Sequence, residues 1–170
     1  MGVKVTVRGG ELKGLRKYLA HLLENPKPGV KVGVLDGAAY SDGPLAGEPV
    51  AQNLARHEFG TESIPARAPF RSTLEKKKGE WSKGTADYLK AASGSGKMNI
   101  RAALTQMGDA AAMDIQQSFE DGLEPELKEA TIRRKEKMGY GTHAAKPVML
   151  TGQSQKAITS EYVDDITKDA

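Results

Sequence analysis

The chain contains no cysteine, few aromatic residues and no long apolar run. The absence of cysteine among its 170 residues excludes disulfides and thiolate metal sites, which suits assembly in a reducing cytoplasm. Aromatic residues make up 5% of the chain, which predicts a thin core or one completed by neighbouring subunits. No apolar run approaches the roughly 20 residues that span a bilayer, and the first eight residues carry no apolar signal segment. We therefore expect one domain, residues 1–170, made in the cytoplasm without membrane contact.

The net charge of +3 and the isoelectric point near 9.0 are mildly basic and do not by themselves indicate a nucleic-acid partner. One basic run is Lys76-Lys77-Lys78. A second run supplies candidate contacts with DNA or with an acidic neighbour: Arg133, Arg134, Lys135 and Lys137. The alternative for both runs is a solvated helix face. Because no aromatic residue is interleaved, base stacking is not expected, and only contact with the DNA backbone remains.

Periodic apolar residues predict the order of the elements. Alternating valines predict strands at residues 3–7 and 29–35, and leucines spaced by three and four predict a helix at residues 11–24. Further helices are predicted at residues 49–59, 69–92, 98–120 and 128–138. A short helical turn at residues 151–152 and a strand at residues 157–163 follow. A long loop and a C-terminal tail are expected at residues 36–48 and 164–170.

These elements predict an α+β fold, in which a small antiparallel or mixed sheet of about three to five strands packs with two long helices and several long loops. The long helices should bury one face each. For the first, the face is expected at Phe70, Leu74, Trp81 and Leu89. For the second, the stripe is expected at Ile100, Leu104, Met107, Ala111, Ile115 and Phe119.

No pattern in the chain is typical of a catalytic, metal or cofactor site. The segment Ser93-Gly94-Ser95-Gly96-Lys97 lacks the strand and the flanking residues of a phosphate-binding loop, and Gly94-Ser95-Gly96 has the wrong spacing for a nucleophile elbow. His57 has no second histidine at helical spacing to complete a zinc motif. We expect His57 to serve as a cation near a helix C-terminus. The chain is thus expected to be no enzyme and to hold no cofactor or metal.

Two sequence blocks carry the most specific information. The first contains His57-Glu58-Phe59-Gly60-Thr61, Ile64-Pro65-Ala66-Arg67 and Pro69-Phe70-Arg71. It predicts a helix end, a glycine stop and a proline-rich turn into a new helix. We expect this segment to be a rigid connector, with Phe70 buried as the anchor of the second helix. The second block runs from Lys146-Pro147 to Thr151-Gly152-Gln153 and continues into Ala157-Ile158-Thr159.

In this order the two blocks resemble those of the tail-completion proteins, the neck or head-tail joining proteins of lambdoid and Mu-like tailed bacteriophages. The resemblance covers roughly residues 48–163. The chain departs from the family pattern where Ala68 separates Arg67 from Pro69, and where Ser154 replaces a usual leucine. The resemblance implies a set of motif and interface residues: His57, Glu58, Phe59, Gly60, Thr61, Ile64, Pro65, Arg67, Pro69, Phe70, Arg71, Pro147, Thr151 and Gly152.

The resemblance implies a structural virion protein that works as a homo-oligomeric ring, most often a hexamer, at the neck where the tail joins the head. Its implied partners are head-closure, tail-terminator or tail-tube proteins, with possible non-specific contact with packaged DNA. We expect the loop at residues 36–48 to lie at a subunit contact, so that deletion of residues 38–46 should leave a folded monomer but block ring or virion assembly. The alternatives are a head-closure (stopper) or tail-terminator ring protein, and a basic nucleic-acid-binding protein that acts alone.

Overall fold

The computed structural model describes residues 27–35, 37–94, 99–148 and 152–168. The chain divides into two compact units, residues 1–29 with 163–170 and residues 30–162. The predicted strand at residues 3–7 and the predicted helix at residues 11–24 lie outside the described residues. The predicted break at residues 93–96 falls largely outside them too, because residues 95–98 are not described.

The prediction of an α+β fold with a small sheet and long helices is confirmed. The two described strands pair antiparallel in one sheet: β1 (Gly29–Val34) and β2 (Ile158–Val163). The helices are α2 (Val50–Phe59), α3 (Pro69–Gly94), α4 (Ile100–Asp121), α5 (Glu129–Lys137) and α6 (Gln153–Lys156). Single 3₁₀ turns occupy Gly43–Leu45, Gly141–His143 and Ile166–Lys168. The predicted bounds of the described helices and strands therefore hold to within about two residues.

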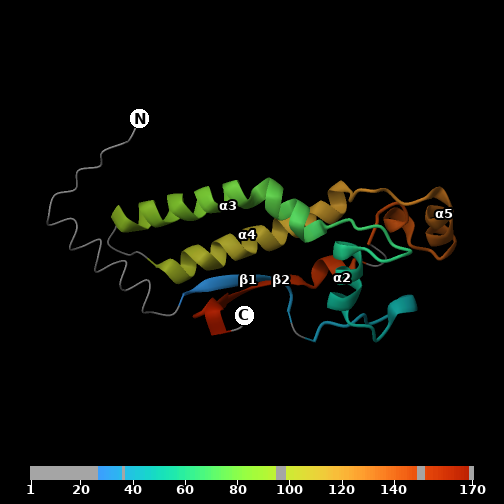
Figure 1. Ribbon diagram of the computed structural model, residues 1–170, viewed down its shortest axis with the longest axis horizontal. Coiled ribbons are helices and arrows are strands. Elements are labelled where there is room, and N and C mark those ends of the chain that lie inside the picture. Colours follow the sequence, from blue (N-terminus) through green and yellow to red (C-terminus); the bar gives the residue numbers. More distant parts are fainter. Residues whose placement is uncertain (1–26, 36, 95–98, 149–151, 169–170) are drawn as a thin grey trace. The chain divides into compact units, whose positions relative to one another are not determined.

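Helix α4 lies between α3 and the two strands (Figure 1), and it contributes Ala112, Ile115 and Phe119 to the core cluster. Its stripe is buried at Ala111, Ile115 and Phe119, as the periodicity predicts. At Gly108 the helix approaches the sheet so closely that an added Cβ would meet the side chains of Val30 and Ser160. The core therefore forms on the face of the two-stranded sheet that α4 covers.

The start of α4 and the middle of α3 depart from the predicted faces. Ile100 is exposed and Leu74 is half-exposed, so neither belongs to the core. The two helices are instead joined by a polar contact, in which Trp81 Nε1 donates a hydrogen bond to Asp114 Oδ2 at 2.6 Å. A groove between the two helices is lined by Trp81, Gly84, Tyr88 and Ala103 among others.

In the smaller unit, the C-terminal segment folds back onto the residues ahead of β1. Ile166 N donates to Lys27 O at 2.9 Å, and Lys27 N donates to Asp165 Oδ1 at 3.3 Å. The predicted tail at residues 164–170 thus carries a 3₁₀ turn in its described part. Among all the described residues, no helix combines the length and the apolar character needed to cross a membrane.

Candidate interaction site at the two motif blocks

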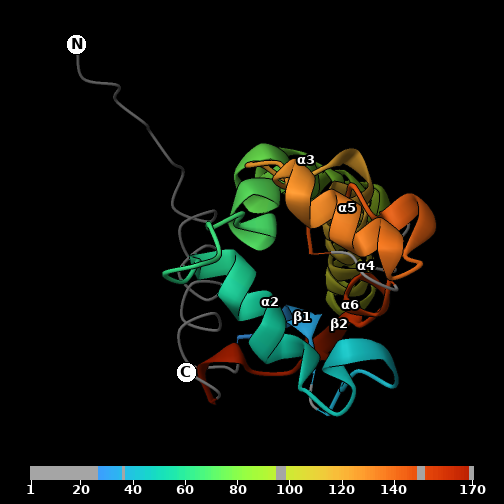
Figure 2. The ribbon, with the colours of Figure 1, turned by 90° about the vertical axis from the view of Figure 1, so that its right-hand side faces the viewer.

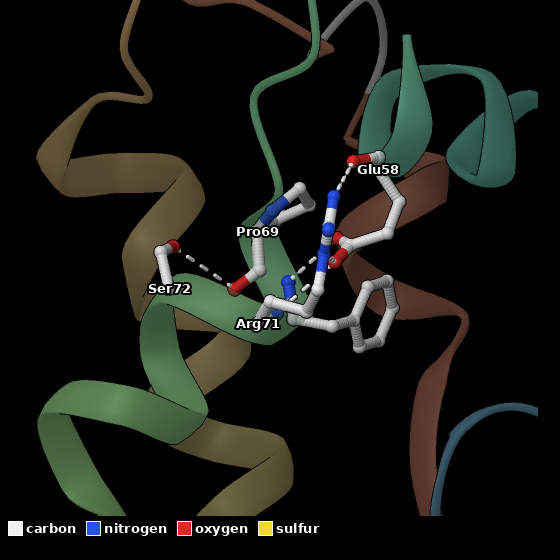
Figure 3. A network of polar contacts seen from close by, with 5 residues as sticks. Glu58, Pro69, Arg71 and Ser72 are labelled. Carbon is white, nitrogen blue, oxygen red and sulfur yellow. Dashed lines mark hydrogen bonds and ion pairs between the residues drawn. The ribbon is translucent and has the colours of Figure 1, made fainter.

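The last turn of α2 presents a buried carboxylate to the first turn of α3 (Figure 3). Glu58 is 6% exposed, its Oε2 accepts a hydrogen bond from Phe70 N at 3.0 Å, and its Oε1 accepts one from Arg71 N at 3.2 Å. First-turn amides have no partner within their own helix. Ala68, the residue ahead of α3, has no side-chain acceptor to satisfy them. Glu58 therefore caps a helix other than its own, and its charge lies at the positive end of that helix dipole.

Arg71 completes the junction by binding back to the end of α2. Its Nε donates to Glu58 Oε1 at 2.8 Å, and its Nη2 donates to the backbone oxygen of Glu58 at 2.5 Å. The guanidinium carbon lies 5.1 Å from the centre of the Phe59 ring, within cation-π range. The cation that the C-terminus of α2 attracts is thus Arg71, which reaches it from the next helix (Figure 3).

The connector between the two helices is closed by backbone hydrogen bonds. Arg67 N donates to His57 O at 2.7 Å, and Thr61 N donates to Ile64 O at 2.7 Å. Gly60, the C-cap of α2, has φ 79° and ψ 171°, a conformation that is essentially restricted to glycine. A Cβ at Gly60 would also lie 2.9 Å from Ala66 N. The glycine stop predicted from the sequence is therefore required both by backbone conformation and by crowding.

Replacing Gly60 by alanine is expected to lower the free energy of unfolding by about 2 kcal/mol, because it adds strain and a clash with the connector. Urea denaturation of the purified protein measures the change. Gly139→Ala is the matched control, since Gly139 has φ 81° and open space around its Cα. A loss no larger in Gly60→Ala than in Gly139→Ala would show that the crowding at Ala66 has no effect.

Lys135 corrects one prediction, because it is buried and is no exposed contact for a partner. It is 7% exposed, and its Nζ donates to His143 O at 2.6 Å and to Lys146 O at 2.7 Å. Burial, followed by the charge of Arg67, lowers the pKa of Lys135 to about 8. The ammonium of α5 thus holds the segment that leads into the second motif block, and its charge also reaches the first block.

His57 corrects a second prediction, since it is not the cation expected at the end of α2. Burial, followed by the nearby charges of Arg67, Arg56 and Lys135, lowers its pKa to about 4. The ring is therefore neutral at pH 7, and its Nδ1 is buried without a hydrogen-bond partner in the described residues. The physical reason is that burial disfavours the charged imidazolium, and three nearby cations disfavour a further positive charge.

His57 should make the folded state sensitive to mild acid. Its pKa is about 4 in the folded chain against 6.5 for an unperturbed histidine, so the unfolded chain binds the proton first. The contribution of His57 to the free energy of unfolding is fully present above pH 6.5 and is lost as the pH falls toward 4. We expect a loss of about 2 kcal/mol from this group, less than the full shift because the ring is partly exposed and screened. Urea denaturation at pH 7 and pH 4.5 measures it, and His57→Gln should remove this part of the pH dependence. Equal losses in both proteins would contradict it.

The second motif block lies against α4 and α5 in its described part. Pro147 and Val148 are buried, and the ammonium of Lys146 pairs with Glu120. Gly152 is buried at φ 76° and ψ 0° and serves as the N-cap of α6, as the predicted helical turn requires. Thr151 lies outside the described residues. Since Lys135 binds the carbonyl of Lys146 while its charge acts on His57, the two blocks meet around the same buried ammonium.

A buried polar network ties the loop ahead of α2 to α6. Asn53 Nδ2 donates to Tyr40 Oη at 2.7 Å, and Tyr40 Oη lies 2.7 Å from Ser154 Oγ. Because the tyrosine oxygen already accepts from Asn53, its own proton is free to be donated to Ser154. Ser154, the departure from the family pattern, is therefore matched by Tyr40 in this chain.

The loop described at residues 37–48 is held to its own chain, which corrects the expectation that its removal leaves a folded monomer. Tyr40 belongs to the core, and its backbone N donates to Glu48 O at 3.1 Å. Gln153 binds the loop from α6, since its Oε1 accepts from Ser41 N at 2.8 Å. A deletion of residues 38–46 would remove Tyr40 and open the core. Whether the loop also meets another subunit stays a prediction.

The remaining motif residues divide into buried and exposed positions. Phe70 is half-buried against the core, and the fully buried residue beside it is Pro69, so Phe70 is not the buried anchor that the sequence predicts. Ile64 is half-buried, and Thr61 and Pro65 are exposed. On α5, Arg134 and Lys137 are exposed, and Arg133 Nη2 donates to Glu129 Oε2 at 2.6 Å on the surface.

No protein-family model, curated protein or solved structure matches this chain. In the part of the chain that the structure describes, no group of three histidine, aspartate or glutamate side chains is placed to hold a metal ion.

Proposed function

We propose that this chain is a structural virion protein of a tailed bacteriophage, a tail-completion subunit that forms a homo-oligomeric ring at the neck. The observation that supports this proposal most is the set of contacts made by the residues of the first motif block. The polar side chains of Glu58 and Arg71 bind α2 to the start of α3. The same junction holds the side chain of Phe59 at the surface, where it is 70% exposed. A junction of this kind is suited to presenting a surface to a neighbouring protein.

The surroundings of Phe59 have the composition of a protein interface. A groove of about 200 Å³ beside the ring is lined by Val34, Ala51, Leu54 and Phe70 among others, and Figure 2 shows α2 beside β1 at this place. Exposed aromatic residues together with arginine are enriched at protein interfaces. We therefore assign the partner-binding surface of the proposed subunit to Phe59 and this groove.

The proposed assembly is tested by replacing Phe59 with alanine. Because the side chain of Phe59 is mostly exposed, the melting temperature of the variant should change by no more than about 2 °C. Assembly of the oligomeric ring and the joining of tails to heads should fail. Light scattering on the purified protein and electron micrographs of complemented particles give the two readouts. Met113→Ala is the control, since Met113 is 68% exposed and lies on α4. Normal rings and normal infectious particles from Phe59→Ala would overturn the assignment.

A basic nucleic-acid-binding protein that acts alone is the second candidate, and the exposed Arg134 and Lys137 on α5 favour it. Salt separates the two candidates, because DNA binding that depends on phosphate contacts weakens steeply between 50 and 200 mM salt. A ring held by apolar contacts should persist over that range. Glutamine at Arg133, Arg134 and Lys137 should leave folding intact, since exposed charges contribute little to stability.

A further inference from the structure

Arg67 lines a cleft between the start of α3 and the C-terminal part of α4, and it is a buried cation that makes no ion pair within the described residues. The cleft has a volume of about 370 Å³. Arg67 is 7% exposed, and its Nε donates to Pro125 O at 2.8 Å. None of the ion pairs among the described residues involves Arg67. Burial lowers the pKa of the Arg67 guanidinium, because the loss of water disfavours its charged form.

Thr73 adds a second polar group to the same cleft. It is 5% exposed, and its hydroxyl makes no hydrogen bond within the described residues. The neighbouring hydroxyls are already used as donors, since Ser118 Oγ donates to Ile115 O at 2.7 Å and Ser72 Oγ donates to Pro69 O at 3.5 Å. The guanidinium of Arg67 and the hydroxyl of Thr73 are thus donors that the cleft offers to a ligand, together with the ammonium of Lys76.

The other charges of the cleft decide which anion fits. Lys76 lines the cleft one turn after Thr73 and favours an anion. Asp121 and Glu124 line the same cleft and repel a second negative charge. Lys77 and Asp114 line it too, and they already have partners in Glu80 and Trp81. A single carboxylate matches this arrangement, because it can accept a bidentate contact from arginine and one hydroxyl bond while adding one charge only. A DNA backbone or an inorganic phosphate would bring more negative charge against the two acids.

We propose that the cleft at Arg67 and Thr73 is a binding site for a single carboxylate, supplied by an acidic side chain of another protein or by a small free carboxylate. Arg67 and Thr73 bind its oxygens, and Lys76 adds attraction at long range. The site does not depend on the neck function, since its test uses the isolated chain and a ligand that is not a phage protein.

The test is an NMR titration of the full chain with sodium acetate, with sodium chloride at equal ionic strength as the reference. Saturable shifts are expected at the Arg67 Nε–H and at the Thr73 amide. Thr73→Val should weaken acetate binding about threefold to tenfold with folding intact, because it removes one hydrogen bond from the anion. Arg67→Gln should abolish binding. Arg133→Gln is the control, because Arg133 is an exposed arginine paired with Glu129, and it should bind acetate as the wild type does.

Further ligands separate the sources of the anion. A blocked peptide with one central glutamate that binds more tightly than acetate assigns the site to a protein side chain, whereas equal affinity assigns it to a free carboxylate. The proposal is overturned if acetate gives no saturable shift, if Thr73→Val binds acetate as tightly as the wild type, or if phosphate or a short DNA duplex binds Arg67 more tightly than acetate. If Arg67→Gln does not fold, Thr73→Val alone decides between these outcomes.

Discussion

Replacing Glu58 by alanine is expected to lower the free energy of unfolding by about 3–4 kcal/mol. The loss of a helix cap accounts for about 1–2 kcal/mol. The rest comes from groups that lose their partner, because two amides of α3 and the Nε of Arg71 all donate to this carboxylate. Urea denaturation followed by circular dichroism measures the change. The free energy of unfolding of Glu58→Gln should lie between those of the wild type and Glu58→Ala, because glutamine keeps the shape and one acceptor but loses the charge.

The matched control for Glu58 is Glu48, a carboxylate that pairs with Arg56 on α2. Glu48 Oε2 lies 3.3 Å from Arg56 Nη1, and both side chains are about two-fifths exposed, at 42% and 41%. Glu48→Ala should therefore cost no more than about 1 kcal/mol. A loss of that small size in Glu58→Ala would show that the junction between α2 and α3 is held by its apolar contacts and not by the carboxylate.

The sequence predicts most of the elements because their signals are local. Gly60 and Gly122 both end their helices at positive φ, and Pro69 begins α3 where its fixed φ and missing N–H are tolerated. The stripe of α4 is buried over its second half for the same reason, since its periodicity matches one helix face. These rules act within a few residues of the chain, so a single sequence contains them.

The candidate site is less predictable because its contacts join distant elements. Glu58 is the one acidic residue of α2 and resembles an ordinary surface acid, and nothing near it shows that it caps α3 twelve residues later. Lys135 lies among basic residues in the sequence, yet its ammonium donates hydrogen bonds to the backbone oxygens of His143 and Lys146. Its spacing of three residues from Ile132 is the only local hint that it shares the inner face of α5.

The prediction of buried faces is wrong at two positions on the long helices for a related reason. Leu74 and Ile100 fit a helical stripe, but a stripe is buried only where another element covers it. The contact between α3 and α4 is supported instead by Trp81 and Asp114, a polar pair that hydrophobic periodicity does not detect. The protonation state of His57 likewise depends on its burial and on charges from two other segments, so its position near the end of the helix indicates the wrong protonation state.

Replacing Gly108 by valine is expected to lower the free energy of unfolding by about 3 kcal/mol, because α4 has no room for a side chain where it crosses the sheet. A Cβ there would collide with the side chain of Val30 and would lie 3.1 Å from Ser160 Cβ. Both neighbours belong to the paired strands, so neither can move without disturbing the sheet or the core. Thermal unfolding of the purified protein measures the loss.

Alanine at the same position gives a test of sign. Helix propensity alone predicts that alanine in place of a mid-helix glycine stabilises by up to about 1 kcal/mol, whereas the crowding at Gly108 predicts a net loss of about 1–2 kcal/mol. Gly84→Ala on α3 is the control, since open space surrounds Gly84 and only propensity acts there. The melting temperature should rise for Gly84→Ala and fall for Gly108→Ala. If both rise, α4 does not approach β1 and β2 as closely as the structure shows, and the core on that face of the sheet is looser than the positions of Val30 and Ser160 imply.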